Sequence, residues 1–286
     1  MIRRAAAALT LACTSVAPAQ SPPVTYGVTA GVVRFNSQRS ERAFSGTLQF
    51  QPRDWLSFDV TPVFLSAELD SAGVAYTSTG AGDLPISGSV SKSFDDAFWS
   101  PDLGLGLELT LPTGNTACGL GSGSAGLGLD LGVGLSPVDP LHLYVNASRS
   151  LSGLSSASSL DAPEATSLSL EASYQVTPRF SAGLSFGGDF GHADSTQALS
   201  RSIGGGASWS VKGPLAISLG ASHGLTTGSA RWALSIGFGT AFAGTNPVNP
   251  DTPARLLRHV FSGGVGRGNG QGHIGGSNKS KSTSCS

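Results

Sequence analysis

Charged residues are scarce in this chain: Asp, Glu, Lys and Arg make up only 12% of its 286 residues, about half the usual share of roughly 25%. Long hydrophobic runs are also missing. No stretch of about 18 apolar residues occurs, which excludes a membrane protein built from spanning helices. The 40 glycines keep no three-residue period, which excludes collagen. Low charge together with 39% hydrophobic residues argues against a charged disordered chain and against an ordinary cytosolic enzyme.

The first part of the chain predicts a signal peptide over residues 1–19, cleaved on export through the inner membrane. Two arginines precede the short apolar segment Ala5–Ala12, and Ala17–Ala19 has the small residues of a cleavage site. Cys13 leaves lipid modification open as an alternative, although Thr10 stands where lipoproteins commonly have Leu. The simpler interpretation is a cysteine that is lost with the signal.

The last part, residues 244–286, predicts a low-complexity, disordered tail. Pro, Gly, Asn and Ser dominate it, strand alternation is absent, and five basic residues against one acidic residue give it a net charge of +4. A basic tail could touch anionic lipid or a cell-wall polymer, and a solvated linker is the alternative. Between the two ends, residues 20–243 form the predicted folded domain.

Apolar and small or polar residues alternate many times within that domain. In Ala125–Leu135, AGLGLDLGVGL, one side is almost entirely Leu and the other is almost entirely Gly, with Asp130 among the glycines. A strand separates two such sets and a helix does not. The pattern predicts twelve strands: Tyr26–Val32, Phe44–Phe50, Leu56–Val60, Leu84–Phe94, Leu103–Leu111, Ala125–Leu135, Leu141–Ala147, Leu168–Val176, Phe180–Phe186, Ile203–Val211, Leu215–Ala221 and Trp232–Phe242.

The connections between these strands are of two alternating kinds. The short ones are mostly marked by Pro, and the others are mostly longer and richer in Gly, Ser and Asp. The longer loops are expected at 36–42, 67–82, 112–123, 149–165, 187–201 and 222–229. An even strand count with short turns at one end and longer loops at the other is typical of an outer-membrane barrel. The predicted fold is therefore an all-β, antiparallel transmembrane β-barrel of about 12 strands.

Aromatic residues gather at both ends of the predicted strands, as membrane interfaces favour. Those beside the short turns are Phe50, Trp55, Phe94, Phe98, Tyr174, Phe180, Trp209 and Phe242, and those beside the long loops are Phe35, Phe44, Phe64, Phe186, Phe190 and Trp232. A soluble β-sandwich or a β-solenoid would also alternate. Neither explains the signal peptide and the two kinds of connection together.

The polar face of the strands carries the candidate site. We expect the residues that line the lumen to include Asp59, Glu108, Asp130, His142, Tyr144, Glu171 and Arg231, with a net charge of −3. In one interpretation they bias permeation toward cations or neutral solutes. In the other they are ordinary wet lumen residues that pair with one another.

No catalytic or cofactor-binding pattern is predicted. Gly121–Gly126 has the G-x-G-x-x-G spacing of a dinucleotide site, but it leads into a strand where that site needs a helix. The five histidines have no metal-like spacing. His142 and Ser148 both project inward, whereas a lipid-cleaving pair would have to reach lipid and would need an acidic or amide partner. We therefore expect no enzyme activity, no cofactor and no metal.

Cys118 and Cys285 are expected on opposite sides of the membrane. Cys118 falls in a long loop and Cys285 in the tail beyond the last strand. At that separation an intramolecular disulfide is excluded. Each is then a free thiol or pairs with another chain.

Three segments resemble a known family, the outer-membrane proteins named for the meta-pathway of phenol degradation. The shared pattern is Gly-x-Gly-Asp entering a strand, a strand ending in Leu-Pro-Thr-Gly, and Gly-x-Gly before the next strand. Its residues here are Gly80, Gly82 and Asp83, then Leu111, Pro112, Thr113 and Gly114, then Gly121 and Gly123. The resemblance implies an outer-membrane transporter or channel. One departure is that 44 residues follow Phe242, where such barrels commonly end on an aromatic residue.

The sequence thus predicts a channel or transporter in a bacterial outer membrane for the passive passage of small solutes, including small hydrophobic or aromatic compounds. The alternative is a structural or surface-interaction protein with a plugged lumen. The expected partners are outer-membrane lipid, the barrel-assembly machinery and a small solute that the sequence does not identify. Nucleic acid is not expected, and the oligomeric state stays open.

Overall fold

The computed structural model describes most of the predicted folded domain. The described residues are 24–35, 39–71, 74–94, 99–151, 166–190, 200–212, 215–226 and 229–240. The predicted signal peptide and tail, and with them Phe98 and Phe242, lie outside these ranges.

Strands dominate the described residues, with a single short 3-10 helix, η1, between β7 and β8. The elements are β1 Val24–Arg34, β2 Arg39–Arg53, β3 Leu56–Val60, β4 Val63–Ser71, β5 Val74–Ala81, β6 Leu84–Ser93, β7 Asp102–Leu111, η1 Thr116–Cys118, β8 Gly126–Val138, β9 Leu141–Leu151, β10 Thr166–Thr177, β11 Phe180–Phe190, β12 Arg201–Lys212, β13 Leu215–Gly224 and β14 Trp232–Gly239. Among the described residues, no helix is long and apolar enough to cross a membrane.

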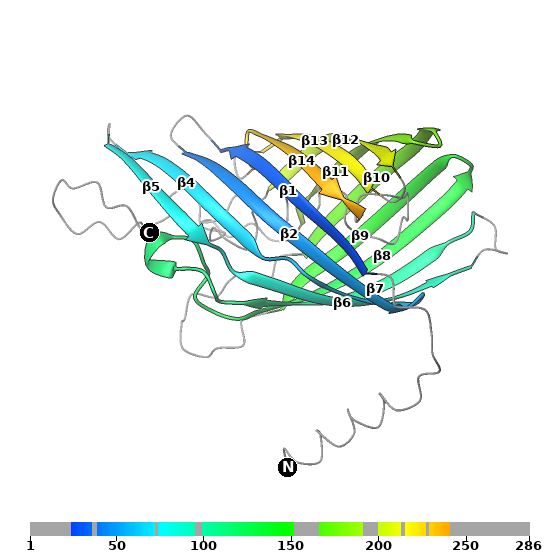
Figure 1. Cartoon of the computed structure of the whole chain (residues 1–286), viewed down its shortest axis with the longest axis horizontal. Helices are drawn as coiled ribbons and strands as arrows, with labels where there is room; N and C mark the ends of the chain where they lie inside the picture. Colours follow the sequence, from blue (N-terminus) through cyan, green and yellow to red (C-terminus); the bar gives the residue numbers. More distant parts are fainter. Residues whose placement is uncertain are drawn as a thin grey trace, which may run out of the picture.

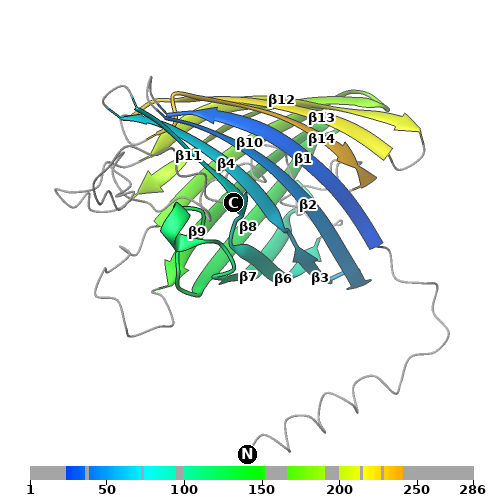
Figure 2. The same ribbon diagram turned by 60° about the vertical axis from the view of Figure 1, so that its left-hand side comes forward.

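Fourteen strand segments form one closed, antiparallel barrel (Figures 1 and 2). The barrel closes because β1 pairs with β2 on one side and with β14 on the other. Two of its strands are interrupted. β3 and β4 both pair with β2 and are separated only by Thr61 and Pro62, and β5 and β6 continue each other across Gly82 and Asp83. The fourteen segments therefore make twelve strands, which confirms the predicted fold.

The breaks keep the backbone hydrogen-bonded even though they interrupt the ladder. Thr61 donates its N–H to the carbonyl of Pro85, and the carbonyl of Pro62 accepts from Gly46. Gly82 donates to the carbonyl of Val63 in the same way. At each break the strand changes direction while these backbone groups stay hydrogen-bonded.

One predicted loop is wrong. Residues 67–82 were expected to be a long connection, but most of them belong to β4 and β5, which form a hairpin at the long-loop end. Strands also extend into other predicted loops: β2 begins at Arg39, β9 runs to Leu151 and β11 runs to Phe190. These strands stay paired with their neighbours beyond the ends that were predicted for them. Polar residues in the sequence therefore do not by themselves end a strand.

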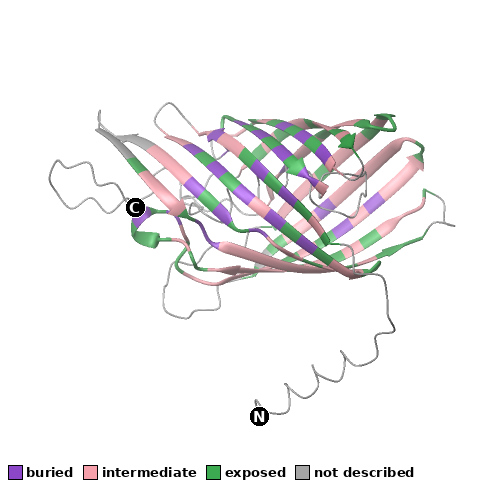
Figure 3. Cartoon of the chain, in the orientation of Figure 1, coloured by how far each residue is buried: buried purple, intermediate pink, exposed green. Residues whose placement is uncertain are grey.

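The two faces of each strand separate as the alternation predicts. Along β2 the inward residues are buried and the outward residues are exposed, and Figure 3 shows the same banding on its neighbours. The outward residues are large and apolar: Leu48, Leu107, Leu131 and Leu219 are each more than half exposed. The outward face is therefore an apolar band, as a barrel in contact with hydrocarbon requires.

Exposed aromatic side chains mark the short-turn end of that band. Phe180 pairs with Trp209, which pairs with Ile217, which in turn pairs with Phe238. This cross-strand row lies on the outward face, and Trp209 is 61% exposed. A row of this kind is the girdle expected at a membrane interface.

Candidate functional site: the lumen and the clasp at its long-loop end

The strand register places six of the seven predicted lumen residues on the inward face. In an antiparallel sheet, residues paired across strands point to the same side. Asp59 pairs with the buried Gln49, and the row continues through Ser87 to Glu108. In a second row, Tyr144 pairs with Glu171.

Asp130 and His142 join the same face through their own pairs. Asp130 pairs with Ser148, and His142 pairs with Ser173. Arg231 differs, because it lies in a bend before β14 and is exposed. Its backbone carbonyl accepts a hydrogen bond from Gly224.

The four acidic residues predicted for the lumen, Asp59, Glu108, Asp130 and Glu171, lie on β3, β7, β8 and β10. In the order of strands around the barrel, these positions centre on the wall across from the seam between β14 and β1. Glu108 pairs with Gly128 and Asp130 pairs with Gly106, so the two carboxylates are diagonal neighbours on adjacent strands. Ser87 donates a hydrogen bond to Asp59 at 2.5 Å. One wall of the lumen is therefore acidic.

Small residues opposite large ones give the lumen its internal contacts. Gly132 leaves the space into which the Tyr144 hydroxyl reaches, since a Cβ at Gly132 would overlap it. Gly128, by contrast, has ordinary room, because its nearest neighbour would be the Cβ of Glu108 at 3.6 Å. The room for a larger inward side chain therefore differs between these two positions of β8.

His142 and Ser148 do not form a catalytic pair. His142 Nδ1 lies 2.9 Å from the hydroxyl of Ser136, while the hydroxyl of Ser148 lies 2.5 Å from that of Ser167. The six-residue spacing along β9 separates the two positions by about 20 Å. Within the part of the chain that the structure describes, no three His, Cys, Asp or Glu side chains come together as a metal site would need.

The sequence reasoning missed one buried ion pair at the long-loop end. Glu41 is 1% exposed, and Arg39 donates to it with contacts of 2.6 and 2.8 Å. The guanidinium of Arg39 also lies over the ring of Phe35, 4.6 Å from its centre. Residues 36–42 were expected to be a loop, so the alternation that places Glu41 inward was not followed there.

A clasp holds the break between β5 and β6 to the loop between β7 and β8. We define the Asp83 clasp as Gly82, Asp83, Thr113, Gly114 and Ser122. Asp83 accepts hydrogen bonds from the N–H of Gly114 at 2.9 Å and from both the N–H and the hydroxyl of Ser122 at 2.7 Å. The hydroxyl of Thr113 donates to the carbonyl of Gly82 at 2.9 Å.

Two glycines of the clasp region are required by close approach. A Cβ on Gly114 would overlap the carbonyl of Leu120, and one on Gly121 would come within 2.7 Å of the Asp83 carboxylate. Three separate segments of the family pattern thus meet at one buried carboxylate, which is 3% exposed. The residues that carried the resemblance therefore build a structural joint at the mouth of the barrel.

The loop between β7 and β8 also contributes apolar side chains that face the lumen. Leu120 and Cys118 pack with Ala43, Val63 and Leu65 in one buried cluster. The strand residues of this cluster point inward, so the loop covers part of the lumen wall. An apolar patch thus lies at the long-loop end of an interior whose other residues are mostly polar or small.

The prediction for Cys118 is wrong. Cys118 is disulfide-bonded in this single chain, and its partner lies outside the described residues. The prediction relied on the strand pattern alone, which does not record how cysteines outside the strands approach Cys118.

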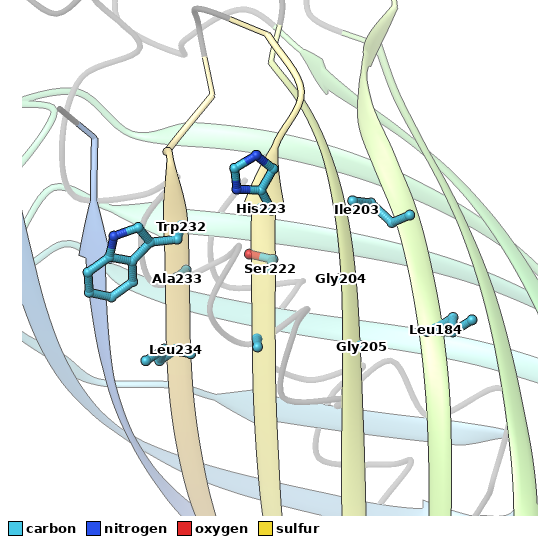
Figure 4. Close-up of a pocket in the computed structure, with 10 residues that line it drawn as sticks. Leu184, Ile203, Gly204, Gly205, Ser222, His223, Trp232, Ala233 and Leu234 are labelled. Atoms are coloured by element: carbon cyan, nitrogen blue, oxygen red, sulfur yellow. The ribbon is translucent and has the colours of Figure 1, made fainter.

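The groove in Figure 4 belongs to the outward face rather than to the lumen. Leu184, Ile203, Trp232 and Leu234 form its walls, and Gly205 lies on its floor. Its volume is about 530 Å³. Its large side chains are those of the apolar band, so hydrocarbon chains of a bilayer fit it.

A closed twelve-stranded barrel with an apolar outside and a polar inside is the architecture of outer-membrane barrel proteins. The chain belongs to the family described as "Putative MetA-pathway of phenol degradation", whose model matches residues 14–242. A search of curated proteins finds no match.

Comparison with solved structures shows a likeness in fold to one channel and gives a weaker match to a second. The COG4313 outer membrane channel from Pseudomonas putida F1 is 15% identical, with 79% of this chain and 99% of that chain covered and a TM-score of 0.56. The CymD monoaromatic hydrocarbon channel is 10% identical, with 77% and 88% covered and a TM-score of 0.42.

Proposed function

We propose that this protein is a channel or transporter of a bacterial outer membrane that lets small solutes pass through its lumen. The observation that carries the proposal is the division of the barrel into an apolar outside and a polar inside, which runs along all of its strands. Such a wall is stable in a bilayer and leaves water-compatible groups around the axis. Outer-membrane lipid and the barrel-assembly machinery are the partners that this location requires.

The proposed solutes are small compounds that combine an apolar body with a polar group, such as phenols. Two features of the interior support this class. The acidic wall and the serine-rich lumen face offer hydrogen-bond partners, and the cluster around Leu65 and Leu120 offers an apolar contact at the entrance. The family description, which refers to phenol degradation, points the same way.

Among the lumen residues that the structure describes, we assign none to catalysis, and we propose that the protein acts without chemical change of its solute. Several of the serine hydroxyls there are bonded to one another, as Ser57 is to Ser89 at 2.7 Å and Ser181 to Ser208 at 2.7 Å. Hydroxyls paired in this way line a wet wall and have no base to activate them.

The test is uptake of phenol and of a charged sugar phosphate into liposomes that contain the purified protein, with empty liposomes as the control. Faster entry of phenol alone is the expected result. Equal entry into both kinds of liposome, together with a silent planar bilayer in oxidised and in reduced samples, would reject transport. A surface-interaction protein with a plugged lumen would then be the better description.

A further inference from the structure

The groove of Figure 4 is a gap in the outward apolar band, and small outward residues create it. The register aligns Leu234, Ala221, Gly205 and Leu184 in one outward row across β14, β13, β12 and β11. The two leucines form the sides of the groove, and the small residues between them leave its middle open. The gap is therefore a feature of the strand sequences.

The same four strands have no such gap nearer the short turns. There the outward row consists of Phe180, Trp209, Ile217 and Phe238, which are all large. The groove thus belongs to the half of the wall that is nearer the long loops. In an outer-membrane barrel this half lies in the outer leaflet, because the longer loops are extracellular.

The next outward row toward the loops brings hydrogen-bond donors to the end of the groove. Trp232 pairs with His223, and His223 pairs with Ile203. Figure 4 shows these three side chains side by side across β14, β13 and β12, with Leu234 and Leu184 further along the strands. Indole and imidazole rings each carry an N–H donor. The groove therefore changes from apolar to polar at its long-loop end.

A cation lies one row further toward the loops. Arg201 is exposed and lies two residues before Ile203 in β12, so the two share the outward face. The carbonyl of Arg201 accepts from the N–H of Leu225 at 2.8 Å, and its own N–H donates to the hydroxyl of Ser229 at 2.7 Å. Arg201 and His223 are therefore diagonal neighbours, roughly 7–8 Å apart, on backbone that is held in place.

The guanidinium of Arg201 is positioned for an anion. It lies over the ring of Phe190, 5.2 Å from its centre. Stacking of this kind leaves the N–H groups at the edge of the guanidinium plane able to donate to a phosphate. Among the described residues of β11 to β14, Asp189 is the one acidic residue, and it pairs with Ser167 on the lumen face. The outward face beside the groove is therefore basic.

We propose that this groove binds one molecule of lipopolysaccharide, the acylated and phosphorylated glycolipid of the outer leaflet. An acyl chain lies between Leu184 and Leu234, and a phosphate group lies at Arg201 and His223. This inference goes beyond the proposed transport function. It depends on the location in the outer membrane and not on passage of a solute through the lumen.

Charge and position together select this lipid. Arginine to phosphate is a charge-assisted contact, and basic sites beside apolar membrane surfaces bind anionic lipid headgroups. Phospholipid is the lipid of the other leaflet, which the short-turn end of the barrel meets. A groove whose polar end points to the long loops has the orientation that a lipid of the outer leaflet requires.

The first experiment measures binding of the headgroup. Purified full-length protein is titrated with diphosphoryl lipid A, with dephosphorylated lipid A or with phosphatidylglycerol, and the bound lipid is counted by native mass spectrometry. One diphosphoryl lipid A should be retained in preference to the other two lipids. Arg201→Gln combined with His223→Gln should weaken this binding by roughly tenfold or more, because charge-assisted hydrogen bonds are lost.

Arg179→Gln is the matched control, since Arg179 is exposed in the turn between β10 and β11 at the short-turn end. It should bind diphosphoryl lipid A as the unchanged protein does. Equal retention of phosphatidylglycerol would overturn the choice of lipid. Equal binding by the double variant, or an equal loss in Arg179→Gln, would overturn the site.

The second experiment fills the groove. Ala221→Leu places a larger side chain in the gap, and Leu219 shows that the outward face of β13 carries leucine. Binding of diphosphoryl lipid A should weaken, while the shift between unheated and boiled protein on a gel should be kept. Ala147→Leu is the control, because Ala147 pairs with the outward Leu131 away from the groove.

Unchanged binding in an assembled Ala221→Leu protein would overturn the groove as the seat of the acyl chain. If this variant does not assemble, the double variant of the first experiment decides the proposal. Neither readout uses solute uptake or conductance, so failure here is distinct from failure of transport.

Discussion

Asp83 and Gly114 lie 31 residues apart in the chain, and the carboxylate of Asp83 accepts a hydrogen bond from the backbone N–H of Gly114 at 2.9 Å. The same carboxylate also holds Ser122. A single buried acid therefore joins an interrupted strand to the loop that carries Cys118. The position of that loop over the lumen depends on this joint.

Replacing Asp83 by Asn should loosen the clasp. One of its oxygens becomes an NH₂ group that cannot accept, so the donors it served lose a charged partner. The expected loss is roughly 2–3 kcal/mol in the free energy of unfolding, measured by urea titration. Protease cleavage within residues 112–125 should also become faster. Asp54→Asn is the control, since Asp54 lies exposed in the turn between β2 and β3, and it should stay within about 0.5 kcal/mol.

Gly114→Ala should damage the same joint by sterics rather than by charge. The new Cβ overlaps the backbone of Leu120, which cannot rotate away as a side chain can. We expect a loss of about 1–3 kcal/mol in the same urea titration. Gly46→Ala is the matched change, because its nearest neighbour would be Pro62 at 4.0 Å. Equal behaviour of the two variants would show that the loop backbone adapts.

Arginine on the two faces of β8 should have opposite consequences. Leu131 is 55% exposed on the outward face near the middle of β8, whereas Leu129 lies nearer its end and pairs with Arg149. Leu131→Arg should cost about 2–4 kcal/mol in a lipid-embedded unfolding assay. Gly128→Arg enters the lumen and should assemble. A greater loss for Gly128→Arg would mean that the assignment of inside and outside is inverted.

The acidic wall should set the ion preference of the pore. Charge that lines a lumen acts directly on a passing ion. Asp130→Asn combined with Glu171→Gln should therefore move the reversal potential toward zero in a salt gradient, recorded on reduced protein in a planar bilayer. Asp54→Asn should leave the potential unchanged. An unaltered reversal potential in the double variant would place both carboxylates off the ion path.

The closed barrel should also show in its resistance to detergent. Every strand is paired on both sides over much of its length, so SDS at room temperature should leave the barrel folded. The unheated protein should then migrate faster on a gel than the boiled protein. Identical migration, together with a helical circular dichroism spectrum, would contradict the fold.

Most of the fold was predictable because one pattern repeats along most strands. Outward apolar residues alternate with inward residues that are small or polar. The Leu and Gly alternation of β8 is the clearest case. The rule failed for β4 and β5, because Pro62 and Gly82 interrupt the alternation and the residues around Glu68 are as polar as a loop. β4 pairs with β2 and β5 pairs only with β4, and the polar sequence of this hairpin does not record either pairing.

Only part of the candidate site was predictable, because local patterns do not record long-range contacts. Alternation placed Asp59, Glu108 and Glu171 on the inner face, since strand parity is a local property. The family pattern pointed to Gly82, Asp83 and Gly114 but not to their meeting at one carboxylate, which depends on long-range contact. The disulfide of Cys118 was excluded because the strand pattern does not record how cysteines outside the strands approach it.

The seam between β1 and β14 puts a limit on the order of assembly. It consists of eight residue pairs, from Gly27 with Gly239 to Arg34 with Trp232. The ring can close only when the last strand is in place. The seam is therefore the last of these pairings to form, and it is the step that removes the two open strand edges of the unfinished sheet.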